Sequence, residues 1–210
     1  MNKNLIIMAS IILVSSCSVF NRAFLPLENI PKPSGPHRVG TMVLEWEDKS
    51  RKEWFTKEEG DNRRLMIQFW YPTNEEIVPS LNPYLDHPSK RAKPISDQIG
   101  VPSLFMTHLD AVNKNSIDNA SISKNSKDFP LVVFSHGLGG MRMQNTIQCE
   151  ELASRGYVVV AMDHAFDAHA TFFSDKTLAD FRSGIEGKVS PEEFWSIRTP
   201  QLRTRAEDIS

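Results

Sequence analysis

The chain has 210 residues, of which 40% are hydrophobic and 24% charged, and its formal net charge is -2. This composition excludes an intrinsically disordered chain and is typical of one globular domain with a real core. A nearly balanced charge does not indicate nucleic-acid binding. The two cysteines, Cys17 and Cys149, are too few for a disulfide framework.

The first residues have the pattern of an export signal. Residues 5–14 form an apolar stretch of about ten residues, which is too short to span a membrane and suits the centre of a signal peptide. The following Val-Ser-Ser-Cys17 resembles a bacterial lipobox, in which the cysteine becomes the lipidated first residue. We therefore expect a signal peptide over residues 1–16 and a membrane anchor at Cys17. Ser18 favours sorting to the outer membrane. The alternative is an ordinary secretory signal in which Cys17 is incidental.

A tether and a strand hairpin follow. Residues 21–36 contain four prolines and little periodicity, so we expect a tether over residues 17–36 and a domain over residues 37–210. Residues 39–46 and 65–71 alternate between apolar and polar side chains, as half-buried strands do. The charged segment between them predicts an antiparallel hairpin with a long connection. Pro72 is expected to end the second strand.

A long insertion separates this hairpin from the next strand. Residues 73–128 are rich in proline in their first half, which argues against long helices there. Residues 103–112 have apolar side chains near helical spacing and could form a short helix. The insertion either helps to cover a substrate pocket or is a surface excursion that only packs.

The most informative stretch is Phe-Pro-Leu-Val-Val-Phe-Ser-His-Gly-Leu-Gly-Gly, residues 129–140. The unbroken apolar run from Leu131 to Phe134 predicts a strand buried on both faces, as in a parallel sheet. Three glycines in the next turn allow the backbone to bend sharply and approach another group closely. Backbone N–H groups in such a turn, beside a helix N-terminus, are suited to an anion.

A helix and a second buried strand complete a βαβ unit. Apolar residues from Met143 to Ala153 lie near one helical face, Gly156 is a helix stop, and residues 157–162 form another apolar run. Cys149 falls on the apolar side of the helix, so we interpret it as a buried hydrophobe and not as a nucleophile. The cluster of aspartates and histidines over residues 163–169 could be read as metal ligands. No helix or hairpin fixes its spacing, and we predict neither a metal nor another cofactor.

The last residues predict a helix. Ser-Pro-Glu-Glu193 is a capping box that begins at Ser190, with proline at the first helical position. Pro200 is expected to break or kink this helix, with Thr199 as a new cap. Three apolar residues then continue on one face with arginines on the other: Leu202, Ala206 and Ile209. The chain stops at Ser210 within this pattern, which we interpret as the mark of an N-terminal fragment.

The stretch over residues 129–140, together with Glu-Leu-Ala-Ser-Arg-Gly-Tyr-Val-Val-Val-Ala-Met-Asp-His at 151–164, resembles the secreted platelet-activating-factor acetylhydrolases and their bacterial relatives. The resemblance runs from about Gly35 to the C-terminus. It implies an α/β-hydrolase sheet, with an antiparallel first hairpin and then parallel strands joined by crossover helices. The implied activity is serine-dependent hydrolysis of short sn-2 acyl esters of phospholipids, without a metal.

The resemblance also implies roles for the glycine turn. The backbone N–H of Leu138 is the candidate oxyanion-hole donor. His136, Gly137, Gly139 and Gly140 shape the turn, and His136 is not the catalytic base, which comes last in chain order in this fold. No G-x-S-x-G occurs in the chain. The catalytic Ser, Asp and His are therefore expected to be absent, and the chain to be inactive alone.

Two other functions stay open. A dienelactone-hydrolase-like or general carboxylesterase would use the same turn on a small ester. A surface lipoprotein without catalysis would keep the partial sheet as a binding module, and the missing triad favours this reading if Ser210 is the native end.

Overall fold

The computed structural model describes residues 30–56, 58–76, 83–100, 102, 106, 109, 112–124, 128–185 and 187–210. The predicted signal peptide, Cys17, most of the tether and most of the helix predicted over residues 103–112 lie outside these residues. The described residues form two compact units, one with residues 30–32 and 83–115 and the other with residues 33–76 and 116–210. Within the described ranges, no helix has both the length and the apolar composition needed to cross a membrane.

The smaller unit contains a helix in the segment where the proline content argued against one. Helix α2 spans Pro88–Ile99, with Pro88 in its first turn and Pro94 inside it. The expectation of no long helix there is wrong, because a proline at a helix start removes no helical hydrogen bond and an interior proline removes only one. The helix ends at Gly100, whose φ of 71° is the left-handed conformation common after a helix.

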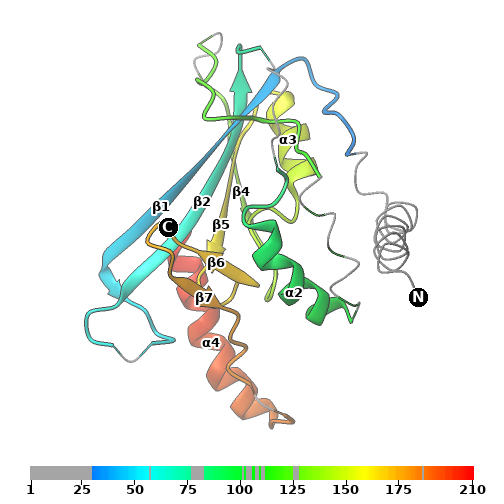
Figure 1. The fold of residues 1–210 in the computed structure, drawn as a ribbon. Helices are drawn as coiled ribbons and strands as arrows, with labels where there is room; N and C mark the ends of the chain where they lie inside the picture. The colour runs from blue at the N-terminus through cyan, green and yellow to red at the C-terminus, as the bar shows by residue number, and fades with distance from the viewer. Residues whose placement is uncertain are drawn as a thin grey trace, which may run out of the picture. The chain divides into compact units, whose positions relative to one another are not determined.

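The larger unit is built on one five-stranded sheet in the order β3-β1-β2-β5-β4 (Figure 1). Strands β1 (Arg38–Lys52) and β2 (Asn62–Thr73) form the predicted antiparallel hairpin, and β2 also pairs antiparallel with β5 (Val158–His164). Strand β4 (Leu131–Ser135) runs parallel to β5, and the short β3 (Ile117–Asp118) runs parallel to β1. The α/β fold class with an antiparallel first hairpin is confirmed.

Strand β2 continues through Pro72, against the expectation that this proline ends it. Pro72 pairs with Val39 of β1. On its other side β2 is paired with β5 only from Leu65 to Trp70, so the proline lies beyond that ladder. On that side Thr73 forms a bridge with Ile122, and the Pro72 carbonyl accepts a hydrogen bond from the Ser123 N–H at 2.8 Å, so β2 continues without an N–H at Pro72.

Helix α3 (Thr146–Ser154) connects β4 to β5 and completes the predicted βαβ unit. It ends before Gly156, whose φ is 94°. Its side chains Cys149 and Ala153 lie in a buried cluster with residues of three strands, including Trp70 and Val159. Burial, reinforced by the charge of Glu150, raises the pKa of Cys149 to about 12, so the thiol is an inert core group.

Strand β4 differs from the prediction of a strand buried on both faces. Leu131 is 62% exposed and Val133 41% exposed. Val132 and Phe134, on the opposite face, pack against the core. Among the described residues, therefore, only the face of β4 that carries Val132 and Phe134 is packed. The central position predicted for β5 is correct.

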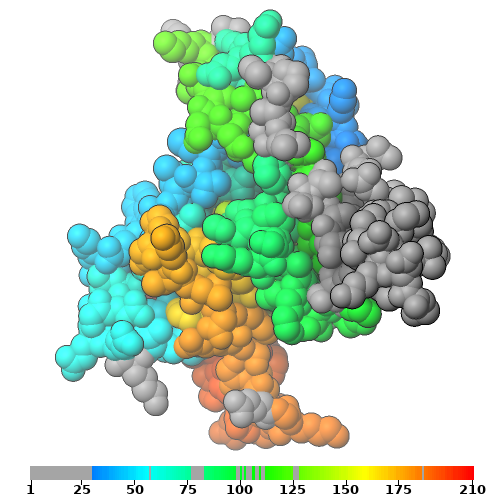
Figure 2. All heavy atoms as spheres, in the orientation of Figure 1, coloured from blue at the N-terminus to red at the C-terminus, as the bar shows by residue number. Residues whose placement is uncertain are grey.

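Three further elements follow β5. Strands β6 (Ala170–Phe172) and β7 (Leu178–Asp180) form a separate two-stranded sheet. In Figure 2 this segment, in orange, lies against the β1–β2 hairpin in blue and cyan, and Ser174 Oγ donates a hydrogen bond to Glu45. Helix α4 spans Pro191–Glu207, and Ser190 Oγ accepts its capping hydrogen bond from the Glu193 N–H at 3.2 Å.

Helix α4 departs from prediction in two respects. Pro200 lies inside one continuous helix, and no new helix begins at Thr199. Leu202 is 52% exposed, whereas Gln201 is 1% exposed, so the apolar face is not the buried one. On the buried face, the polar side chains of Gln201 and Arg205 form hydrogen bonds.

Candidate functional site

The glycine turn lies at the carboxyl end of the two parallel strands. Residues 136–140 leave the end of β4, and residues 163–169 begin in the last two positions of β5. Ser135 is paired with Met162 in the parallel register, so the two segments emerge at the same edge. In α/β sheets this is the edge at which ligands bind.

His136 is buried, with 1% of its surface exposed, and it holds the turn. Its Nε2 accepts a hydrogen bond from the backbone N–H of His164 at 3.2 Å, and its Nδ1 lies 2.6 Å from the carbonyl oxygen of Gly137. Because a backbone N–H can only donate, Nε2 is unprotonated and Nδ1 carries the proton that Gly137 accepts. Burial lowers the pKa of His136 to about 4, and the charges of His164 and Arg205 act in the same direction. The side chain is therefore a neutral donor at physiological pH.

The direction of the Leu138 N–H follows from the contacts of Gly137. The Gly137 carbonyl accepts from His136 Nδ1 and from the Gly140 N–H, the latter at 2.8 Å. In a planar trans peptide the N–H points away from the carbonyl, so the Leu138 N–H points away from these two donors. Within the described part of the chain it donates to no acceptor, and the Leu138 residue is 41% exposed. This N–H is available to an oxygen from outside the turn.

Two of the three glycines in this turn are required by its geometry. Gly139 has a φ of 74°, a backbone conformation that residues other than glycine rarely adopt. Its N–H donates to the carbonyl of Asp167 at 2.8 Å. A Cβ on Gly140 would lie 2.9 Å from the Gly137 oxygen, too close for any side chain. A Cβ on Gly137 would meet nothing within 4 Å, so packing does not demand glycine there.

A hydrogen-bonded chain of Ser135, His164 and Asp208 lies beside the turn. Ser135 Oγ is 2.9 Å from His164 Nε2, and His164 Nδ1 is 2.8 Å from Asp208 Oδ2. The side chains of His164 and Asp208 are both 0% exposed. Sequence reasoning missed this arrangement, because no local motif joins a residue at the end of β4 to one at the end of α4. Only the parallel register of the strands and the return of α4 reveal it.

The hydrogen bonds link a serine, a histidine and an aspartate in the same sequence as in a catalytic triad, but the charges around the aspartate differ from those of a triad. Asp208 also accepts hydrogen bonds from Arg63 (2.6 Å and 3.1 Å) and Arg51 (3.0 Å). Burial alone would raise the pKa of Asp208, but the hydrogen bonds from His164 and Arg63 and the charge of Arg63 hold it well below its usual range. A carboxylate shared with two arginines has little capacity left to stabilise an imidazolium, which a catalytic base must become. Arg205 Nη2 also donates to Ser135 Oγ at 3.1 Å. We interpret the arrangement as structural.

The inward face of α4 carries Gln201, Arg205 and Asp208, which are spaced along one side of a helix. Arg205 donates to the His136 carbonyl as well as to Ser135. Gln201 Nε2 donates to the side chain of Asp167. These contacts explain why the polar face of α4 is the buried one.

The acidic and histidine side chains after β5 do not converge on a common centre. Asp163 pairs with the Arg142 guanidinium and accepts from the Arg142 N–H at 2.6 Å. His164 bonds to Asp208, and Asp167 bonds to Gln201. Over the described ranges, no group of three or more His, Cys, Asp or Glu is arranged to hold a metal ion.

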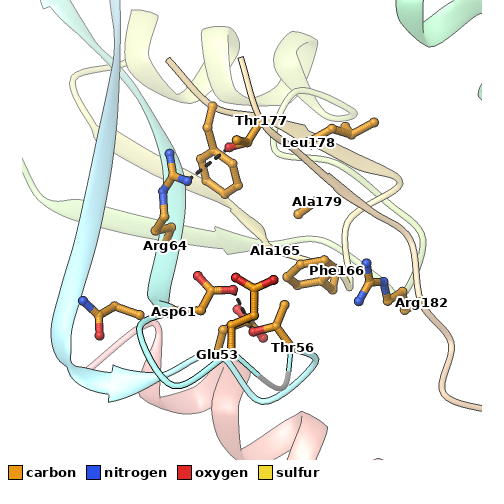
Figure 3. Close-up of a pocket in the computed structure, with 13 residues that line it drawn as sticks. Glu53, Thr56, Asp61, Arg64, Ala165, Phe166, Thr177, Leu178, Ala179 and Arg182 are labelled. Atoms are coloured by element: carbon orange, nitrogen blue, oxygen red, sulfur yellow. Dashed lines mark hydrogen bonds between the residues drawn. The ribbon is translucent and has the colours of Figure 1, made fainter. Parts of the chain in front are cut away.

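A separate cavity of about 310 Å³ lies between the β1–β2 connection and the residues that follow β5. Figure 3 shows carboxylates of Glu53 and Asp61 on one side of it and the ring of Phe166 beside Arg182, whose guanidinium carbon is 4.4 Å from the ring centre. Phe166 has a φ of 65°, which is uncommon for a bulky residue. The residues of the glycine turn do not line this cavity, so we assign it no part in ester chemistry.

Comparisons with known proteins agree with the sequence resemblance. The family described as "Platelet-activating factor acetylhydrolase, isoform II" matches residues 23–210. The platelet-activating factor acetylhydrolase of Gallus gallus is 30% identical over 198 residues, which cover 85% of this chain and 43% of that protein. The Cavia porcellus protein of the same name is 30% identical, with 86% of this chain and 40% of that protein covered.

A solved structure is also similar. The ferulic acid esterase from Streptomyces cinnamoneus matches with a TM-score of 0.61 and 29% identity, over 83% of this chain and 47% of that one. The chain thus spans less than half the length of these relatives. Since the family match includes the whole of the described sheet and helices, the chain belongs to the platelet-activating factor acetylhydrolase isoform II family.

Proposed function

We propose that this chain supplies the oxyanion-binding turn of a serine ester hydrolase that removes short acyl groups from the sn-2 position of phospholipids. The observation that carries the proposal is the Leu138 N–H, which points away from the donors that hold Gly137 and has no acceptor in the described part of the chain. Ester hydrolysis passes through a tetrahedral intermediate whose oxygen bears a negative charge. An N–H at that oxygen stabilises the intermediate more than the ester.

The turn is ordered before any substrate arrives. The Gly137 carbonyl is fixed by His136 and Gly140, and Gly139 is fixed by Asp167. A donor that is already in place loses no free energy to reorganisation during the reaction. In related hydrolases one such donor contributes about 2.7–4 kcal/mol to transition-state stabilisation.

We further propose that these 210 residues do not turn over esters by themselves. They contain no G-x-S-x-G, and Ser135 is bonded to a histidine whose carboxylate partner is shared with two arginines. In this fold the second oxyanion donor comes from the residue after the nucleophile. If the chain acts alone, it acts as a binding module.

The choice of substrate rests on the family. Besides the vertebrate relatives, an Arthroderma benhamiae protein that is 26% identical is named a probable 1-alkyl-2-acetylglycerophosphocholine esterase. The test uses an active protein that contains this segment, with sn-2 acetyl and sn-2 palmitoyl phosphatidylcholines compared at equal concentration. We expect faster release of acetate. Equal or preferential release of palmitate would contradict the short-chain assignment.

A general carboxylesterase, including a dienelactone-hydrolase-like enzyme, is the second candidate. The likeness to a ferulic acid esterase, at 29% identity, favours it. A feruloyl ester included in the same assay separates the two candidates. Turnover of the feruloyl ester without turnover of either phospholipid would select the general esterase.

We also propose that Cys17 carries a lipid anchor and that the protein is an exported lipoprotein of the outer membrane. The support is the lipobox-like Val-Ser-Ser-Cys17 after an apolar stretch. An anchor would keep the hydrolase close to a phospholipid surface.

A further inference from the structure

The buried face of α4 contacts both ends of the glycine turn. Arg205 reaches the start of the turn through the His136 carbonyl, and Gln201 reaches its end through Asp167, whose own carbonyl accepts from the Gly139 N–H. These are side-chain contacts from one helix to two segments that follow different strands. They are unusual for a surface helix, whose buried face is normally apolar.

We propose that Arg205 is a positioning residue for the oxyanion turn: by holding the His136 carbonyl, it fixes the peptide plane from which the turn starts. A contribution of Arg205 to catalysis rests on the oxyanion-binding function proposed above. Arg205 does not contact the Leu138 N–H in this arrangement. It acts through the peptides of His136 and Gly137.

The planarity of the peptide bond explains how one contact can orient the turn. The His136 carbonyl and the Gly137 N–H belong to one plane, so a donor at the carbonyl sets the direction of that N–H. The next plane contains the Gly137 carbonyl and the Leu138 N–H, and His136 Nδ1 and the Gly140 N–H hold it. Both planes before Leu138 are therefore fixed.

Arg205 is itself held in place by a closed ring of contacts. Its Nη2 donates to Ser135 Oγ at 3.1 Å, Ser135 Oγ is 2.9 Å from His164, and His164 is 2.8 Å from Asp208. Asp208 lies three residues after Arg205, one turn along the same helical segment. The ring thus attaches α4 at two points to the ends of β4 and β5. This gives the triad-like residues a role that does not require Ser135 to react.

A guanidinium suits this role better than an ammonium does. It presents several N–H donors in a rigid plane, so one group can serve the His136 carbonyl and the Ser135 hydroxyl in fixed geometry. A lysine keeps the charge but offers a flexible point donor. Arg205→Lys should therefore keep part of the effect.

The test measures backbone amide hydrogen exchange by NMR on the 210-residue chain. The reporters are the N–H groups of Gly139, Gly140 and His164, which donate to Asp167, Gly137 and His136. We expect Arg205→Gln to raise their exchange rates about tenfold and Arg205→Lys to raise them less. Rates in the β1–β2 ladder should not change.

Arg203→Gln is the matched control. Arg203 is exposed on the same helix and forms no hydrogen bond or ion pair with the residues that the structure describes. Its variant should leave all three reporters unchanged. Unchanged rates in Arg205→Gln would overturn the proposal. If Arg205→Gln does not fold, Arg205→Lys decides: raised rates at the reporters with an intact ladder support the role, and unchanged rates overturn it.

A titration with diethyl phosphate separates this proposal from the proposed function. This anion imitates a tetrahedral oxyanion, so it should shift the Leu138 amide signal in the wild-type chain and shift it less in Arg205→Gln. No shift in the wild type would contradict the oxyanion role, while the exchange rates would still decide the role of Arg205. A wild-type-sized shift in Arg205→Gln would count against positioning by Arg205 and leave the oxyanion role standing.

Discussion

Asp208 and His164, which lie at the end of α4 and the end of β5, are joined by a hydrogen bond of 2.8 Å between Oδ2 and Nδ1. Both side chains are fully buried. Arg63, with 1% of its side chain exposed, binds the same carboxylate at 2.6 Å. The contact of α4 with the sheet edge therefore depends on a buried ionic network and not on apolar packing.

Removal of one charge from this network should be costly. Among the described residues, Asp208→Asn leaves the Arg63 guanidinium with Glu53 as its remaining ion-pair partner, and an incompletely compensated buried charge costs about 3–5 kcal/mol. We expect a clear fall in the urea midpoint of unfolding. Asp180→Asn is the control, because Asp180 forms an exposed pair with Arg182 and should change stability by less than about 1 kcal/mol. Equal midpoints for the two variants would refute the network's importance.

The lowered pKa of His136 predicts a pH dependence of stability. The unfolded chain takes up a proton near pH 6.5, whereas the folded chain does so only near pH 4. The stabilisation is therefore complete above pH 6.5 and is lost as the pH falls towards 4, by about 3 kcal/mol in total. His136→Asn should be less stable at pH 7 but should lack this part of the slope. Chemical denaturation at a series of pH values measures this slope, and parallel pH profiles for the two proteins would show that folding does not lower the pKa of His136.

The serine of the triad-like chain should not react. Ser135 accepts a hydrogen bond from Arg205, and the Asp208 carboxylate is shared with two arginines, so we expect no labelling by a fluorophosphonate probe. Steady-state hydrolysis of p-nitrophenyl acetate should equal that of a heat-denatured sample. Mass spectrometry of the treated chain detects any probe adduct on Ser135, and Ser135→Ala is the control. A probe adduct on Ser135 would mean that the network is catalytic after all.

The lipobox interpretation predicts the location of the protein. Cys17→Ser should release it from the membrane fraction of an expressing bacterium, because no thiol then remains at the predicted acylation site. Cys149→Ser changes a buried core thiol and should leave the protein with membranes. Detergent-free fractionation and immunoblotting compare the two variants. If the Cys17 variant still sediments with membranes, another feature holds the protein there.

Local patterns predicted the sheet well. Alternation predicted the strands over residues 39–46 and 65–71, and apolar runs predicted β4 and β5. Each pattern depends on a single segment and its nearest neighbours, so sequence periodicity is enough to reveal it. The cap at Ser190 was also predictable, since it depends on residues three positions apart. Expectations based on proline failed three times, in α2, at Pro72 of β2 and in α4, because the effect of a proline depends on which hydrogen bond its missing N–H would have made.

Only part of the candidate oxyanion site could be predicted from the sequence. The glycine turn was visible in the sequence, and its motif placed a candidate donor at Leu138. The contacts that hold the turn were not, because Arg205 and Gln201 reach it from the end of the chain. The sequence pattern placed Leu202 and Ile209 on one apolar face, which is normally the buried one, but both are exposed and the polar face of this helix makes the buried contacts.

The Leu138 N–H is the central group of the proposed oxyanion hole. The most direct measurement is made in an active full-length member of the family that has the same turn, at the position that aligns with Leu138. Proline there removes the N–H, and alanine keeps it. We predict that the proline variant loses about 10²–10³-fold in kcat with little change in KM, while the alanine variant stays close to wild type. A proline variant that folds and keeps the wild-type kcat would contradict the assignment of this turn as an oxyanion hole.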